Sequence, residues 1–125
     1  MNSRDLARYC RDAADDKKAE DIVVMDMHKL SDIADYLVIC SGGSDRHVKA
    51  ICEEIHHVLR KKNCWPFRSD GVHEGQWAVI DYIDVIVHVF QKDLREYYQL
   101  ERLWGDARIV RFRKKLGTSV KGDVH

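Results

Sequence analysis

One strand-to-helix turn in the sequence has residues that could bind an anion. Ser41-Gly42-Gly43-Ser44 follows an apolar run typical of a strand and precedes a strongly amphipathic segment. Free backbone N–H groups at a helix start, together with the helix dipole, can hold a phosphate group. The turn lacks the Lys-Ser/Thr ending of a P-loop and the glycine spacing of a dinucleotide site, which favours a structural turn.

Nucleotidyltransferases also carry Gly-Ser at a helix start, and such an enzyme, using Gly43-Ser44, is the alternative function. These enzymes need paired carboxylates that hold a divalent metal beside the triphosphate, and the strand next to the turn supplies no such pair. Asp81 and Asp84 stand three apart, but no partner for hydrolytic chemistry is specified. We therefore predict a protein that is not an enzyme.

The histidines and cysteines form no recognisable metal or catalytic set. The four cysteines, Cys10, Cys40, Cys52 and Cys64, include no Cys-x-x-Cys pair, and we expect buried reduced thiols, with disulfides or zinc as the alternative. No HExxH or similar ligand spacing occurs among the seven histidines: His28, His47, His56, His57, His73, His88 and His125. The sequence therefore predicts no cofactor and no metal.

His88 differs from the other histidines because it interrupts an apolar strand. Residues that alternate along a strand share one face, so Ile86, His88 and Phe90 should lie together. In a hairpin, the same holds for a row on the preceding strand, Trp77, Val79 and Asp81. Aromatic, imidazole and carboxylate groups are thus predicted to cluster, in the core or at a contact surface.

Hydrophobic periodicity predicts the elements that position these residues. Strands at 77–82 and 85–90 are joined by two residues, too few for a crossover, so they form an antiparallel hairpin. We expect an α/β fold (α+β mixed), with a mixed parallel and antiparallel sheet of about five strands flanked by helices. The other expected elements are a helix at 5–14, strands at 22–27 and 36–41 with a helical turn or a loop at 31–35 between them, a helix from 44 to about 63, a weak strand at 65–68 and a helix at 94–104.

Length and charge suggest one domain with a basic tail. The chain has 125 residues, of which 45% are hydrophobic, enough for a single core. Residues 108–125 hold six bases and one acid, which leaves 15 bases and 20 acids on residues 1–107. We predict a single domain at 1–107 and a flexible tail at 108–125. An acidic body is a poor phosphate binder, so its partner is predicted to be a basic protein surface.

The expected location is the cytoplasm. No apolar run approaches the roughly 20 residues of a membrane span, so no membrane contact is predicted. Residues 1–18 mix acids and bases and have no apolar centre, which fits neither a signal peptide nor a transit peptide.

Three blocks of sequence resemble the Iojap, or ribosomal silencing factor, family. They are SDIADYLVICSGGSDRHVKAI at 31–51, WAVIDYIDVIVHVF at 77–90 and REYYQLERLWGDA at 95–107, and the earlier DDKKAEDIVVMDM extends the resemblance to about residue 15. The resemblance implies a fold similar to nucleotidyltransferases without their catalytic carboxylates. It also implies docking on a basic ribosomal protein at the intersubunit face of the large ribosomal subunit. The protein would thereby block small-subunit joining, repress translation during nutrient limitation and also aid large-subunit assembly.

Matching the family's pattern position by position gives nine candidate partner-binding residues. We expect Asp81, Asp84 and Glu101 to meet Lys or Arg of the ribosomal protein. Trp77, Phe90 and Tyr98 would supply apolar anchors, and His88 a hydrogen bond at the rim. The full set is Trp77, Asp81, Asp84, His88, Phe90, Arg95, Tyr98, Glu101 and Trp104.

Two further interactions are left as alternatives. The basic tail either makes a weak, salt-dependent contact with ribosomal RNA or only solubilises the chain end. The aromatic surface is either free for the ribosome or buried in a homodimer of the free protein.

Overall fold

The computed structural model describes residues 1–30, 32–94 and 107–112. Within them the chain forms two long helices and six strands. In order these are α1 (Ser3–Asp16), β1 (Glu20–Asp26), β2 (Tyr36–Gly42), α2 (Asp45–Arg60), β3 (Arg68–Asp70), β4 (Trp77–Asp81), β5 (Val85–Gln91) and β6 (Arg108–Val110).

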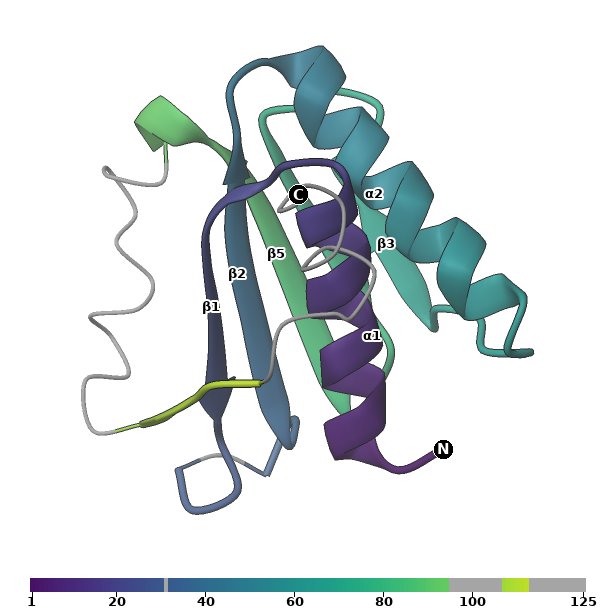
Figure 1. The fold of residues 1–125 in the computed structure, drawn as a ribbon, viewed down its shortest axis with the longest axis vertical. Helices are drawn as coiled ribbons and strands as arrows, with labels where there is room; N and C mark the ends of the chain where they lie inside the picture. Colours follow the sequence, from purple (N-terminus) through teal and green to yellow (C-terminus); the bar gives the residue numbers. More distant parts are fainter. Residues whose placement is uncertain (31, 95–106, 113–125) are drawn as a thin grey trace, which may run out of the picture.

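The strands form one mixed sheet in the order β3-β4-β5-β2-β1-β6. β2 and β5 pair in parallel, and the other neighbouring pairs are antiparallel, including the predicted β4–β5 hairpin. α1 and α2 lie side by side across one face of the sheet (Figure 1). The predicted mixed sheet flanked by helices is confirmed, with six described strands instead of about five.

Strand alternation divides the core between the two faces of the sheet. Under the helices, β-branched and small residues such as Val38, Val87 and Ala78 pack with the buried stripes of α1 and α2. On the other face Met25, Ile39 and Phe90 form a second buried cluster. β2 is buried along its whole length because it is central and covered on both faces.

Local sequence explains where the two helices begin and end. Ser44 caps α2, accepting a hydrogen bond on Oγ from the N–H of His47 at 3.1 Å, as predicted. Asn2 caps α1 in the same way, through the N–H of Asp5. Beyond α2, Asn63 adopts a φ of 58°, the left-handed stop typical of a helix end.

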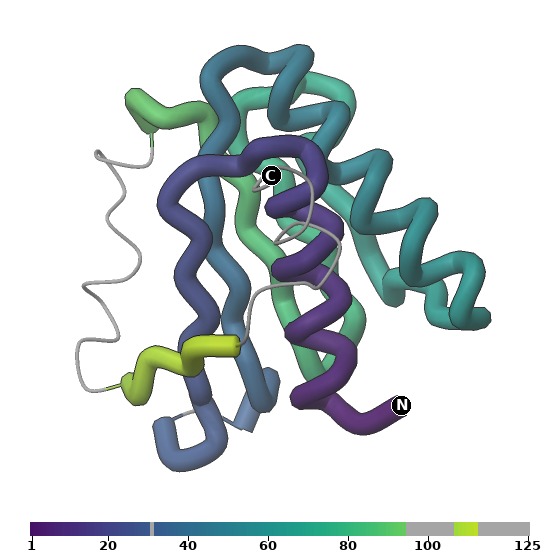
Figure 2. Tube along the Cα trace, in the orientation of Figure 1, coloured from purple at the N-terminus to yellow at the C-terminus, as the bar shows by residue number. Residues whose placement is uncertain are grey.

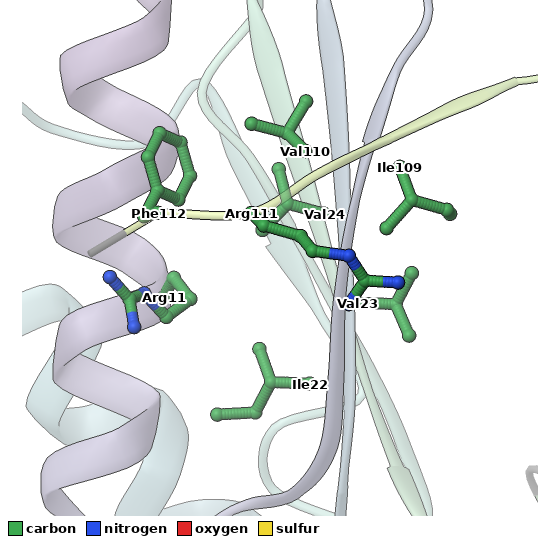
Figure 3. Close-up of a pocket in the computed structure, with 8 residues that line it drawn as sticks. All are labelled: Arg11, Ile22, Val23, Val24, Ile109, Val110, Arg111 and Phe112. Carbon is green, nitrogen blue, oxygen red and sulfur yellow. The ribbon is translucent and has the colours of Figure 1, made fainter. Parts of the chain in front are cut away.

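The predicted boundary at residue 107 is wrong, because residues 108–112 pack on the body of the protein. β6 pairs with Val24–Asp26 of β1, and Val110 joins the core under the helices. Phe112 turns towards α1, where the Arg4 and Arg11 guanidiniums lie 5.0 Å and 5.5 Å from its ring centroid. These segments and β1 line a hollow of about 510 Å³. Figure 3 shows the side chains around it.

Two other predicted elements need comment. The weak strand expected at 65–68 is displaced to Arg68–Asp70 because Pro66 has no N–H to donate and the ladder with β4 begins only at Arg68. The helix predicted at 94–104 falls almost wholly outside the described residues.

All four cysteines are free thiols, and Cys10, Cys40 and Cys52 are buried, as expected.

The strand directions give the molecule two distinct ends. The glycine end consists of the α1–β1 link at 17–19, the β2–α2 turn at 42–44 and the β3–β4 loop at 71–76. The loop end consists of the β1–β2 connection at 27–30 and 32–35, the α2–β3 link at 61–67 and the β4–β5 turn at 82–84. Figure 2 shows the first two glycine-end segments at the top and the β1–β2 connection at the bottom.

Neither described helix is long and apolar enough to cross a membrane.

Candidate functional site

The predicted row of aromatic and polar side chains forms on the face of the sheet opposite the helices. The β4–β5 register places Trp77 across from Phe90 and Val79 across from His88. The Trp77 indole N–H donates to His88 Nδ1 at 3.1 Å, and the Trp77 and Phe90 rings stack with centroids 5.1 Å apart. We call this surface the Trp77 face; it comprises Trp77, Val79, Asp81, Ile86, His88 and Phe90.

His88 is held as a neutral imidazole on this face. Burial disfavours the charged form and lowers the pKa of His88 to about 4. Since Nδ1 accepts the indole hydrogen bond, the ring proton of the neutral form resides on Nε2. His88 therefore presents a fixed hydrogen-bond donor without a charge.

The two predicted aspartates occupy different positions. Asp81 lines a pocket of about 270 Å³ together with Arg68, Asp70, Val79, Ile86 and His88. Its Oδ1 also accepts the N–H of Ile83 at 2.7 Å, which fixes the β4–β5 turn. Asp84 is exposed in that turn and does not line the pocket. The two carboxylates therefore do not face one another as a pair that could hold a metal ion. Each is available separately to a basic partner.

Phe90, predicted as an apolar anchor, lies in the core of the protein. Phe90 is fully buried, so it supports Trp77 by stacking and adds no apolar surface of its own. The alternation of the strand indicated which face Phe90 would share but not how deeply it would lie. Four other predicted residues, Arg95, Tyr98, Glu101 and Trp104, lie outside the described residues.

The glycine turn that could bind an anion is occupied by the protein's own side chains. His47, one turn into α2, accepts the N–H of Gly43 on Nδ1 at 2.9 Å, and its Nε2 donates to the carbonyl oxygen of Lys17 at 2.7 Å. Gly75 of the β3–β4 loop lies so close to Asp45 that a Cβ on it would be 2.7 Å from the Asp45 Cβ. The N–H groups of Gly43, Arg46 and His47, which an anion would need, are therefore engaged within the fold.

A search of the described residues finds no group of three His, Cys, Asp or Glu side chains that could hold a metal ion. The cysteines there are poorly suited to metal binding as well, because burial raises the pKa of the Cys10 and Cys52 thiols.

The exposed apolar side chains of the loop end did not follow from the sequence pattern. Ile33, Ile83, Trp65 and Phe67 are each more than half exposed. In the strand predicted at 65–68, Trp65 and Phe67 would share one face of the sheet, and in the structure both are exposed in the link before β3. The charges that flank them, from Arg60 to Arg68, were the available signal.

Comparison with known proteins decides the family. A family described as ribosomal silencing factor during starvation matches residues 1–123. The chain belongs to this ribosomal silencing factor family. The name describes a regulatory factor of the ribosome, which agrees with the binding surfaces of the structure.

Individual relatives support the same assignment. The ribosomal silencing factor of Bacillus subtilis is 45% identical over 107 residues, which cover 86% of this chain and 91% of that protein. A protein of Mus musculus named mitochondrial assembly of ribosomal large subunit protein 1 is 31% identical over 94 residues, covering 70% of this chain and 40% of that one. A crystal structure of a Chromobacterium violaceum protein superposes with a TM-score of 0.82 at 30% identity, covering 92% of this chain and 95% of the other. The chain therefore shares its fold and most of its length with bacterial relatives.

Proposed function

We propose that this chain represses translation by docking its Trp77 face on a basic ribosomal protein at the intersubunit face of the large subunit, where it blocks small-subunit joining. The observation that carries the proposal is the rigid Trp77–His88 pair beside the Asp81 pocket. The mechanism needs no chemistry, since a seated domain excludes the small subunit by its volume.

Preorganisation makes the Trp77 face suitable for binding a protein. Trp77 is half-buried, stacked on Phe90 and hydrogen-bonded to His88, so little side-chain freedom remains to be lost on binding. Tryptophan is also among the residues that most often dominate interface energies. Asp81 and the exposed Asp84 supply carboxylates for Lys or Arg of the partner, and His88 Nε2 supplies a neutral donor.

The first test measures co-sedimentation of the purified chain with isolated large subunits, followed by addition of small subunits. Asp81→Asn is the sharpest variant, because it removes the charge while an oxygen remains to accept the Ile83 N–H. We expect Asp81→Asn to weaken binding about tenfold and Trp77→Ala to weaken it further. Glu53→Gln, an exposed position on α2, is the control for loss of one negative charge and should bind as the wild type does.

Each outcome of this experiment has a defined meaning. Failure of the wild type to co-sediment would overturn the proposal. Co-sedimentation without a block of joining would retain the docking and reject the repression mechanism. A thermal melt of each variant is needed beside it, because Trp77→Ala also removes the ring that stacks on Phe90.

Two parts of the family expectation extend the proposal. A role in large-subunit assembly is supported by the name of the mouse relative. Self-association of the free protein through the Trp77 face would compete with the ribosome. Sedimentation equilibrium of wild type and Trp77→Ala tests it, and a dimer that survives in the variant would place the contact elsewhere.

A further inference from the structure

Exposed large apolar side chains gather at the loop end of the described structure. Ile33 lies in the β1–β2 connection, Ile83 in the β4–β5 turn, and Trp65 and Phe67 in the α2–β3 link. Backbone hydrogen bonds tie these segments together, from the Phe67 N–H to the carbonyl oxygen of Asp81 at 2.7 Å and from the Asp35 N–H to that of Asp84 at 2.8 Å. The loop end therefore offers a partner exposed apolar surface in addition to its charged groups.

Within this end, the α2–β3 link has its own chemistry. Residues 60–68 contain four bases and no acid, although residues 1–107 as a whole are acidic. The side chains of Trp65 and Phe67 are 66% and 68% exposed. We call the surface made by exposed residues of this segment the 60–68 patch; it comprises Arg60, Lys61, Lys62, Trp65, Phe67 and Arg68.

Each exposed ring has a guanidinium close to it. The Arg60 guanidinium carbon lies 5.9 Å from the Trp65 ring centroid, and that of Arg68 lies 5.9 Å from the Phe67 centroid. Both distances fall within the range of a cation–π contact. A cation beside an aromatic face suits a ligand that combines flat rings with negative charge.

The backbone holds the two rings outward. On one side, the Cys64 N–H donates to the carbonyl oxygen of Leu59 at 2.9 Å, which closes the end of α2. On the other side, Phe67 is fixed by its hydrogen bond to Asp81, and the β3–β4 ladder begins at Arg68. Two anchored ends and Pro66 between the rings limit the freedom that the segment would lose on binding.

We propose that the 60–68 patch binds single-stranded RNA, with bases stacked on Trp65 and Phe67 and phosphates held by the surrounding Lys and Arg. Base stacking on aromatic side chains together with a positive surface is the general means of binding single strands. A protein interface core is depleted in Lys, and a membrane-bound helix needs a continuous apolar face, so both fit this patch less well. For a ribosomal silencing factor the natural source is an unpaired segment of ribosomal RNA.

The patch adjoins the Trp77 face, since Arg68 also lines the Asp81 pocket. A ribosomal surface on which a protein adjoins RNA would therefore contact the Trp77 face and the 60–68 patch at the same time. RNA binding by the patch goes beyond the proposed docking on a ribosomal protein and is measured without the ribosome. Failure of one proposal thus leaves the other standing.

The test is fluorescence anisotropy of a fluorescein-labelled single-stranded RNA dodecamer of mixed sequence, titrated with the full chain in 50 mM and 200 mM KCl. Trp65→Ala and Phe67→Ala should each weaken binding about tenfold, the magnitude of one lost base stack. Trp65→Phe should retain most of the affinity because it keeps an aromatic face. The ring variants should have little effect on binding to an RNA duplex, whose bases are already stacked.

Two double variants with the same change in charge distinguish binding at the 60–68 patch from general electrostatic attraction. Lys61→Glu with Lys62→Glu should weaken binding and reduce the slope of log K against log salt by about 1.4, as expected for two lost phosphate contacts. Lys17→Glu with Lys18→Glu makes the same charge change at exposed positions of the glycine end and should have a much smaller effect. Equal effects of the two pairs, or ring variants that bind as the wild type does, would overturn the proposal. Binding to phosphatidylserine vesicles in place of RNA would do so as well.

Discussion

The two turns that flank β4 both contain residues with positive φ, but the residue types differ. At the glycine end, the β3–β4 loop contains Gly71 at a φ of 78° and Gly75 at a φ of 72°. At the loop end, the β4–β5 turn contains Ile83 at a φ of 74°. Glycine adopts positive φ without penalty, whereas a β-branched residue with positive φ is strained. The first turn is relaxed and buries Gly75, whereas the second is strained and 58% exposed at Ile83.

The difference indicates which end is available to a partner. The glycine end closes on itself through His47, Lys17 and Gly75, and the N–H of Gly43 is used within the fold. Lys18 at the glycine end also has a positive φ, but the loop end holds a β-branched residue, Ile83, in that conformation and exposes apolar side chains as well. Strain of this kind is commonly retained at functional sites. We infer that the residues of the loop end serve contact with a partner, whereas those of the glycine end serve the stability of the fold.

The largest expected effect is at the glycine end. Gly75→Ala should destabilise the fold by about 1–3 kcal/mol from the positive φ alone, and by more because the new Cβ would lie 2.7 Å from Asp45 Cβ. Gly43→Ala is the matched control, since its Cβ would meet nothing nearer than 4.0 Å. Urea unfolding followed by circular dichroism measures both. Equal losses in the two variants would mean that close packing does not distinguish the glycine end.

A smaller effect of opposite sign is expected at the loop end. Ile83→Gly should stabilise the fold by about 1 kcal/mol, because relief of the strained φ outweighs the added chain entropy. Ile83→Ala is the control, since it removes the apolar side chain but keeps the positive φ, and should bring no such gain. The same variants should lose affinity for large subunits if the exposed Ile83 contacts the ribosome. A loss of stability in Ile83→Gly would show that the turn is not strained.

The sequence predicted those parts of the fold that depend on local pattern. The α2 helix, its Ser44 cap and the β4–β5 hairpin follow from periodicity over many residues and from a connection too short for a crossover. The gathering of Trp77 and His88 on one face followed from alternation within the strands and from hairpin pairing, whereas their hydrogen bond was not predicted.

Other features depended on contacts between distant segments. β6 has three residues, too few for a pattern, and forms because β1 offers an edge. The closure of the glycine turn by His47 requires the carbonyl oxygen of Lys17, thirty residues earlier. Burial depth also escaped prediction, since Phe90 and Trp77 share one face while only Phe90 is fully buried. Tertiary packing, which local pattern does not encode, decided each of these.

The smallest expected effect concerns the β1–β2 connection at the loop end. His28 Nδ1 lies 2.6 Å from Asp26 Oδ1, and Nε2 lies 3.6 Å from Asp35 Oδ1, so the ring bridges both ends of the connection. The hydrogen bond to Asp26 raises the pKa of His28, and the hydrogen bonds from His28 lower the pKa of Asp26. Arg108 also acts on Asp26, and Lys29 lines the same pocket.

These shifts set a pH window for the pair. Because the pKa of His28 is raised on folding, its contribution is complete below the unfolded value of about 6.5 and is lost as pH rises through the folded value. His28→Gln should therefore lower the urea midpoint slightly at pH 5.5 and hardly at all at pH 8.5, a small effect because the ring is half exposed. His73→Gln, at an exposed position of the glycine end, should show no such pH dependence. Parallel pH profiles for the two variants would mean that the bridge does not hold the loop end, and the exposed side chains of that end would then depend on backbone hydrogen bonds alone.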